Sequence, residues 1–182
     1  MAGGVTYDEP KLKGAYVIGL ELKEDSRGFF ARTWDENEFA AHGLEPKVVQ
    51  CNVSYNPRRG TVRGMHYQLP PHEEVKLVRC TRGSILDVIV DVRPDSPTHL
   101  RWAGVELTSQ NRLMMYVPRG FAHGYQSLVD DTEVTYQVSE FYHPESEGRL
   151  LWNDPAVGID WPIKVVVISE KDRTAPPLPT RT

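Results

Sequence analysis

The segment Ser84–Val92, read Ser-Ile-Leu-Asp-Val-Ile-Val-Asp-Val, carries the pattern that decides the fold class of this chain. Its even-numbered residues from Leu86 to Val92 form one apolar face, and the odd-numbered residues interleave Asp87 and Asp91. Hydrophobicity that alternates with a period of two predicts a β-strand, because successive side chains of a strand point to opposite faces of the sheet.

Further short segments of β type follow along the chain, separated by Gly, Pro, Asn and Asp residues that favour turns. They are Ala15–Leu22, Val48–Tyr55, Thr61–Gln68, Val75–Cys80, His99–Leu107, Arg112–Val117, Gly124–Leu128, Thr132–Val138 and Val165–Ile168. A single short helix is expected around Phe39 and Ala40, where Asp35 can cap its start and Gly43 can end it. Many short strands with one small helix predict an all-β sandwich or jelly roll.

Length and composition indicate one globular domain over residues 1–182, with its core at about 15–172 and a Pro-rich tail at Ala175–Pro179. The formal net charge of -4 disfavours a nucleic-acid-binding protein, which usually has an excess of basic residues. The N-terminus has no apolar signal segment, and Asp87 and Asp91 interrupt the longest apolar run, so we expect no membrane partner. With only Cys51 and Cys80, no disulfide framework is expected, and the predicted location is cytoplasmic.

Polar residues on the expected strands are the first candidates for a functional site. His66 and Gln68 share one face of Thr61–Gln68, where Gly64 permits a bulge or the close approach of a ligand. Lys76 alternates with apolar residues, and Tyr136 shares its face with Val134 and Val138. Each residue alone has an ordinary structural explanation, and Asp172 alone would be a solvated charge or a turn residue.

The spacing Pro118-Arg119-Gly120-Phe121-Ala122-His123 resembles the second motif of the cupins, in which the histidine points into a barrel. The first cupin motif carries His-x-His followed by Glu, and its counterpart here is His66-x-Gln68 with Glu73 and Glu74 downstream. An amide oxygen replaces imidazole poorly as a ligand of a transition metal. A metal held by His66, Glu73 and His123 is therefore an alternative, and the primary expectation is that no metal is bound. Neither a Gly-x-Ser-x-Gly elbow nor a phosphate-binding glycine loop is present.

Several motifs in one order over most of the chain resemble the dTDP-4-dehydrorhamnose 3,5-epimerase family. They are Ser26–Phe30, Arg63–Gln68, Lys76–Arg79, Gly120–Gly124, Trp152–Pro155 and Ser169–Asp172. The resemblance implies a cupin-type double-stranded β-helix, or jelly roll, that forms a homodimer and uses no cofactor. It also implies a nucleotide-linked 4-keto-6-deoxy sugar as the substrate, inverted at C3, C5 or both in deoxysugar biosynthesis.

The resemblance further assigns roles to individual residues. The base falls on His66, its carboxylate partner on Asp172, the lysine beside the ketone on Lys76 and the tyrosine acid on Tyr136. These types fit proton removal next to a ketone, because imidazole is a suitable base at neutral pH and a buried ammonium stabilises the enolate. Substrate-holding positions fall on Arg27, Arg63, Gln50, Asn52, His123 and Tyr142.

Departures from the family pattern surround the substrate rather than the catalytic residues. Arg32 follows Phe29-Phe30-Ala31 where relatives often have Glu, and Cys51 replaces Asp in the usual Gln-Asp-Asn. If position 32 contacts the base of the nucleotide, a donor has replaced an acceptor, so cytosine is an alternative to thymine. A 3,4-ketoisomerase, which also reacts through an enolate, and a non-catalytic sugar-binding module are the remaining alternatives to an epimerase.

Overall fold

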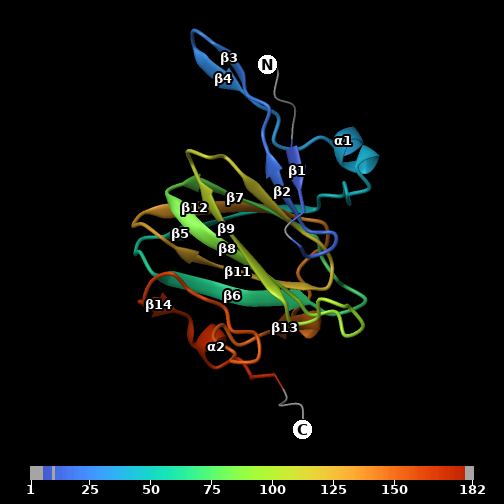
Figure 1. Cartoon of the computed structure of the whole chain (residues 1–182), viewed down its shortest axis with the longest axis vertical. Helices are drawn as coiled ribbons and strands as arrows, with labels where there is room; N and C mark the ends of the chain where they lie inside the picture. Colours follow the sequence, from blue (N-terminus) through green and yellow to red (C-terminus); the bar gives the residue numbers. More distant parts are fainter. Residues whose placement is uncertain (1–5, 10, 179–182) are drawn as a thin grey trace.

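Two antiparallel β-sheets face each other in the computed structural model, which describes residues 6–9 and 11–178 (Figure 1). The first sheet has the order β1-β2-β10-β7-β12-β5. These strands are β1 (Thr6–Asp8), β2 (Tyr16–Gly19), β10 (Met114–Val117), β7 (Lys76–Arg82), β12 (Thr132–Val138) and β5 (Gln50–Asn56). The second sheet has the order β13-β6-β11-β8-β9, and β14 pairs with β6 in parallel. These strands are β13 (Glu147–Arg149), β6 (Thr61–Gln68), β11 (Phe121–Ser127), β8 (Ser84–Asp91), β9 (Trp102–Thr108) and β14 (Val167–Ile168).

The all-β class is confirmed, and every segment expected to form a strand overlaps one. Thr61–Gln68 and Thr132–Val138 have the bounds expected from the sequence, whereas Ala15–Leu22 shortens to β2. The short strands β1, β13, β3 (Lys23–Asp25) and β4 (Gly28–Phe30) were not expected, nor was helix α2 (Glu170–Arg173). Segments of three or four residues are too short to show a hydrophobic period.

Strand β8 illustrates why the pattern of its sequence is so regular. Val88 and Val90 on the even face pack against Met65 and Leu150 outside the sheet, while Ile85 and Ile89 on the odd face lie between the sheets. Asp87 and Asp91 share that inner face and are 0% exposed. Both faces of the strand are therefore buried, and the two aspartates point inward, where each needs a partner.

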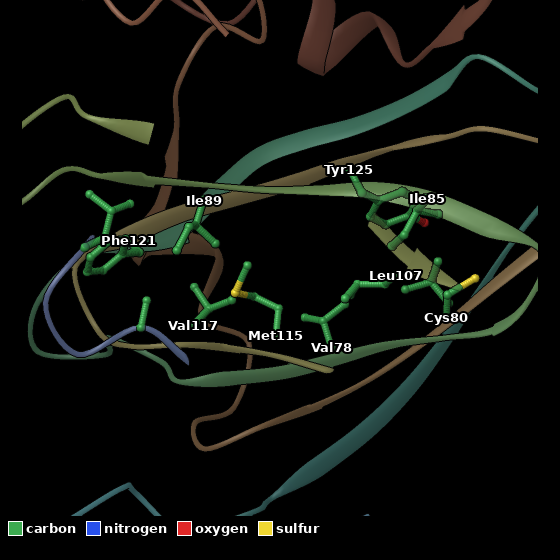
Figure 2. Close-up of a cluster of buried hydrophobic side chains, with 12 residues drawn as sticks. Val78, Cys80, Ile85, Ile89, Leu107, Met115, Val117, Phe121 and Tyr125 are labelled. Carbon is green, nitrogen blue, oxygen red and sulfur yellow. The ribbon is translucent and has the colours of Figure 1, made fainter. Parts of the chain in front are cut away.

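The hydrophobic core lies between the two sheets (Figure 2). Strands of both sheets contribute Val78, Ile89, Met115, Leu107 and Phe121 to this cluster. The core thus fixes the separation of the two sheets at which the candidate site is built.

Helix α1 (Glu36–Ala41) covers the outer face of the first sheet and agrees with the sequence-based expectation. The Asp35 side chain accepts hydrogen bonds from the backbone N–H groups of Asn37 and Glu38, which satisfies donors at the helix start. Phe39 is buried against Tyr116 and Leu77, and Gly43 adopts a φ of 70° just past the helix end.

The C-terminal segment covers the outer face of the second sheet and brings α2 beside β6. Ser169 caps α2 by accepting a hydrogen bond from the backbone N–H of Asp172. The tail expected to be an extended surface segment has no regular structure through residue 178, but Ala175 is buried and Leu178 packs against the sheet. Pro179 lies outside the described residues.

Strands β3 and β4 form a hairpin that projects away from both sheets (Figure 1). Phe29 and Phe30 at this hairpin are 47% and 61% exposed. The Arg112 guanidinium lies 4.4 Å from the centroid of the Phe29 ring. The hairpin therefore presents two aromatic side chains outside the body of the chain.

Candidate active site

A cavity of about 450 Å³ opens between the two sheets beyond the apolar core. Strand β6 contributes His66, β12 contributes Tyr136, β7 contributes Lys76 and α2 contributes Asp172. Strands β11 and β13 add His123 and Arg149. The structure thus gathers in one cavity the residues for which the sequence suggested catalytic roles.

His66 and Asp172 form a closely bonded pair. Nε2 of His66 lies 2.6 Å from Oδ1 of Asp172, whose side chain is 5% exposed. Burial raises the pKa of the Asp172 carboxyl, but hydrogen bonds from His66 and from the Gly64 N–H hold that pKa below its ordinary value. The carboxylate therefore stays ionised at neutral pH, fixes the imidazole ring and leaves its other ring nitrogen available to a substrate.

Arg149 also contacts this pair, although nothing in the sequence identified it. Its Nη1 lies 2.5 Å from Oδ1 of Asp172 and 3.1 Å from Nε2 of His66, and its Nη2 donates to Glu147 at 2.6 Å. Arg149 lies on β13 directly opposite His66 in the strand register. A strand of three residues carries no periodic signal, so this contact depends on tertiary structure.

Gly64 allows the backbone of β6 to approach its neighbour β11. It has a φ of 133°, and a Cβ at this position would lie 2.5 Å from the Cα of Gly124. The register of the two strands also shifts between His123 and Tyr125. The pairing of β6 and β11 is thus irregular beside Gly64, where a bulge was expected, and the close neighbour of Gly64 is the backbone of β11.

Tyr136 faces the cavity from the sheet opposite His66. Burial raises the pKa of the Tyr136 phenol, and the neighbouring Tyr125 and Glu74 raise it further. The phenol is therefore protonated at neutral pH and can donate a proton toward the face of a substrate that His66 does not reach.

Lys76 is buried at 9% exposure, and Glu74 accepts a hydrogen bond from its ammonium group. A buried ammonium requires such a compensating charge. Glu74, which the sequence offered as part of a cupin metal motif, thus serves as the partner of the lysine.

His123 forms a second pair with a carboxylate on the inner face of β8. Its Nε2 lies 2.8 Å from Oδ1 of Asp87. Burial raises the pKa of Asp87, while His123 acts in the opposite direction. Asp87 was read from the sequence only as part of an alternating strand, and its register opposite His123 on β11 reveals the pair.

The remaining substrate-binding candidates divide into two groups. Arg63 lines the main cavity and donates to Asn56 Oδ1 at 2.8 Å. Gln50, Asn52 and Tyr142 line an adjoining pocket of about 270 Å³ that shares His66, Lys76 and Tyr136 with the main cavity. The two pockets form one continuous site with the reacting groups at their junction.

Arg27 and Arg32 are not brought to this site within one chain. Arg27 lies between β3 and β4 with its side chain 87% exposed, paired with Asp25 at 2.6 Å. Arg32 follows β4, is 61% exposed and lies 3.6 Å from Asp35. Neither residue lines the main cavity or the adjoining pocket.

The alternative metal set of His66, Glu73 and His123 is not gathered. Within residues 6–9 and 11–178, the group of potential ligand atoms lying within 4.8 Å of one another belongs to His72, His143 and Glu145. The His72 and His143 rings stack with centroids 3.5 Å apart and 11° between their planes. Parallel rings direct their in-plane nitrogen lone pairs side by side rather than toward one ion.

No helix in the described part of the chain is long and apolar enough to cross a membrane.

Comparisons with known proteins agree with this geometry. The family model described as dTDP-4-dehydrorhamnose 3,5-epimerase matches residues 9–180. The dTDP-4-dehydrorhamnose 3,5-epimerase of Methanothermobacter thermautotrophicus is 45% identical over 170 residues, covering 92% of this chain and 91% of the relative.

Solved structures show the same fold. The Bacillus anthracis dTDP-4-dehydrorhamnose 3,5-epimerase with TDP and PPi bound has a TM-score of 0.92 at 39% identity, covering 96% of this chain and 100% of that one. The Legionella pneumophila dTDP-6-deoxy-D-glucose-3,5-epimerase in complex with dTDP-4-keto-L-rhamnose has a TM-score of 0.89 at 34% identity, covering 94% and 92%. The chain therefore belongs to the dTDP-4-dehydrorhamnose 3,5-epimerase family and is an isomerase that epimerises nucleotide-linked 4-keto-6-deoxyhexoses.

Proposed function

We propose that this epimerase inverts C3 and C5 of its sugar with His66 as the base and Tyr136 as the acid. The observation that carries this proposal is the placement of the two residues on opposite sheets around one cavity. Inversion requires that a proton leave one face of the ring and another arrive at the opposite face. A base and an acid on facing walls meet that requirement without rotation of the substrate.

The first step is proton removal from the carbon next to the C4 ketone. The imidazole nitrogen of His66 that does not bind Asp172 accepts the proton, and the carboxylate stabilises the resulting imidazolium. The C–H electron pair moves into the ring as negative charge develops on the ketone oxygen. The Lys76 ammonium, buried at the junction of the two pockets, stabilises this enolate.

The second step is protonation of the enolate carbon from the opposite face. Tyr136 donates its phenolic proton, and solvent restores the protonation states of Tyr136 and His66. The raised pKa of Tyr136 suits this role, because the group holds its proton until the enolate accepts it. The same two residues serve both carbons, since C3 and C5 are each adjacent to the C4 ketone.

Polar side chains around the cavity hold the rest of the substrate. Arg63 and His123 line the main cavity, and Gln50, Asn52 and Tyr142 line its extension. An arginine suits a diphosphate, because its planar guanidinium can donate two parallel hydrogen bonds. The TDP bound to the Bacillus anthracis relative supports thymidine, rather than cytidine, as the nucleoside.

Arg27 and Arg32 contact the nucleotide in this proposal only if a second copy of the chain supplies them. The projecting β3–β4 hairpin and its exposed Phe29 and Phe30 support such an exchange within a homodimer. Strand β5 supports it as well, because it is the edge of the first sheet and its Val53 is 64% exposed. An exposed apolar edge strand is a common site of association.

Solvent exchange in deuterium oxide tests the reaction directly. With dTDP-4-keto-6-deoxyglucose, deuterium should enter C3 and C5, and the product should have both centres inverted by NMR. Deuterium at C3 alone would limit the enzyme to one centre, and a ketone moved to C3 would indicate a ketoisomerase. Versions linked to CDP, UDP and GDP test the nucleoside.

Matched histidine variants locate the base. His66→Ala should abolish exchange at both carbons, whereas His42→Ala, at the end of α1 and outside both pockets, should leave the rate unchanged. Full activity of His66→Ala would refute the assignment of the base.

A further inference from the structure

Arg149 shares a carboxylate oxygen with His66, which no catalytic role described above explains. Nη1 of Arg149 lies 2.5 Å from the same Oδ1 of Asp172 that His66 contacts at 2.6 Å. We propose that Arg149 is a positioning residue that sets the charge balance of the His66–Asp172 pair and thereby the lowest pH at which His66 can act as the base. This inference rests on the proposed role of His66.

The position of Arg149 is built into the fold. Its strand β13 pairs with β6 so that Arg149 lies opposite His66, and the guanidinium is held on its other side by Glu147 at 2.6 Å. Only 20% of the side chain is exposed. A guanidinium held by two carboxylates keeps a defined geometry, because its fork of N–H groups is rigid.

Two cations therefore compete for one carboxylate when His66 is protonated. The Asp172 side chain is 5% exposed, and its Oδ1 accepts hydrogen bonds from both His66 and Arg149. The carboxylate therefore stabilises each of the two cations less than it would stabilise one of them alone. An imidazolium would also place a positive charge 3.1 Å from the guanidinium nitrogen. Like charges at this distance disfavour the charged form, so Arg149 favours the neutral imidazole that a base requires.

Other titratable groups line the cavity around His66, and two of the cationic or potentially cationic ones have their own carboxylate partners. His123 on β11 pairs with Asp87, and Lys76 on β7 pairs with Glu74. Arg63 on β6 donates to Asn56, Tyr136 on β12 is neutral, and Lys171 of α2 lines the cavity wall. Arg149 differs from all of these groups because it binds the carboxylate that would stabilise the imidazolium.

The expected effect of removing this charge is a shift in pH dependence. In Arg149→Met, which keeps much of the length of the side chain, the acid limb of kcat/KM should move to higher pH by about one unit. In Arg149→Lys the acid limb should move by less than in Arg149→Met, because lysine keeps the positive charge but lacks the rigid fork of the guanidinium. Arg119→Met is the matched control, since it removes an arginine from a half-exposed surface pair with Glu45, and it should leave the limb in place.

A second measurement does not depend on turnover. NMR titration of the His66 ring, identified by the loss of its signals in His66→Gln, should give a higher protonation midpoint in Arg149→Met than in the wild type. This readout remains valid if no sugar nucleotide is converted, so failure of the inference and failure of the proposed reaction are distinguishable. If Arg149→Met does not fold, the same titration is made on Arg149→Lys, for which a smaller upward shift is expected.

An unchanged or lowered midpoint in a folded variant would overturn the inference. So would a raised KM with the acid limb in its original position, because that result would make Arg149 a group that binds the substrate.

Discussion

His66 on β6 and Tyr136 on β12 line one cavity from opposite sheets, so the proposed base and acid reach opposite faces of a bound ring. The sheets that carry these two residues pack around the shared apolar core. This relationship allows the two halves of an inversion to be tested separately.

Tyr136→Phe should separate proton removal from inversion. His66 and Lys76 remain, so proton abstraction and return on the same face should continue and deuterium should still enter the sugar. Protonation from the opposite face should fall by roughly 10²–10⁴-fold, the usual contribution of a positioned acid. NMR of the recovered sugar measures both quantities, and inversion at the wild-type rate would exclude Tyr136 as the acid.

Gly64→Ala should destabilise the fold more than Gly28→Ala. The two glycines have similar φ values of 133° and 125°, but a Cβ at Gly64 meets the Gly124 Cα at 2.5 Å, while a Cβ at Gly28 meets nothing within 4 Å. The backbone strain is thus matched, and the steric clash in Gly64→Ala should add about 1–3 kcal/mol to the loss in free energy of unfolding. Equal losses in denaturant titrations would show that β6 and β11 separate easily.

Asp172 should make the stability of the chain depend on pH in the acidic range. Its pKa in the folded chain lies below the ordinary value of 3.8, so the unfolded chain takes up this proton first as the pH falls. The contribution is present above about pH 4 and is lost as the pH drops through the folded value. The free energy of unfolding should therefore fall less steeply below about pH 4 in Asp172→Asn than in the wild type, and parallel curves would contradict this account.

Cys80 should be inert to thiol reagents in the native chain. Burial raises its pKa to about 11, and its Sγ donates to the Arg82 carbonyl at 3.1 Å. In Cys51→Ser, which leaves Cys80 as the remaining thiol, a disulfide reagent at pH 8 should detect no thiol before denaturation and one after it. Rapid reaction of the native variant would show that β7 opens readily.

Mixing two inactive variants should reveal whether the β3–β4 hairpin serves a second copy. Arg27→Ala lacks the hairpin arginine but keeps the catalytic groups. His66→Ala lacks the proposed base but keeps the hairpin arginine. If each site combines a body from one chain with a hairpin from the other, unfolding and refolding them together should restore part of the activity. The separately refolded variants are the control, and activity no higher than their sum would place Arg27 outside the partner's site.

The sequence alone determined the fold class and predicted several of the residues that line the cavity. Alternation over segments such as Ser84–Val92 and Thr132–Val138 indicates strands, because a sheet with a buried face requires apolar residues at every second position. The ordered family motifs then assigned roles to His66, Lys76, Tyr136 and Asp172, and the structure gathers these residues in one cavity.

Only the tertiary structure decided which charged side chains pair with the residues of the site. Pairing between strands places Arg149 beside His66 and Asp87 beside His123. The register between strands that are far apart in the sequence depends on how both sheets pack around a shared core. The pattern of residues within one strand therefore does not predict it. The same reason explains Arg27 and Arg32, whose sequence positions suggest the site although the fold of one chain holds them away from it.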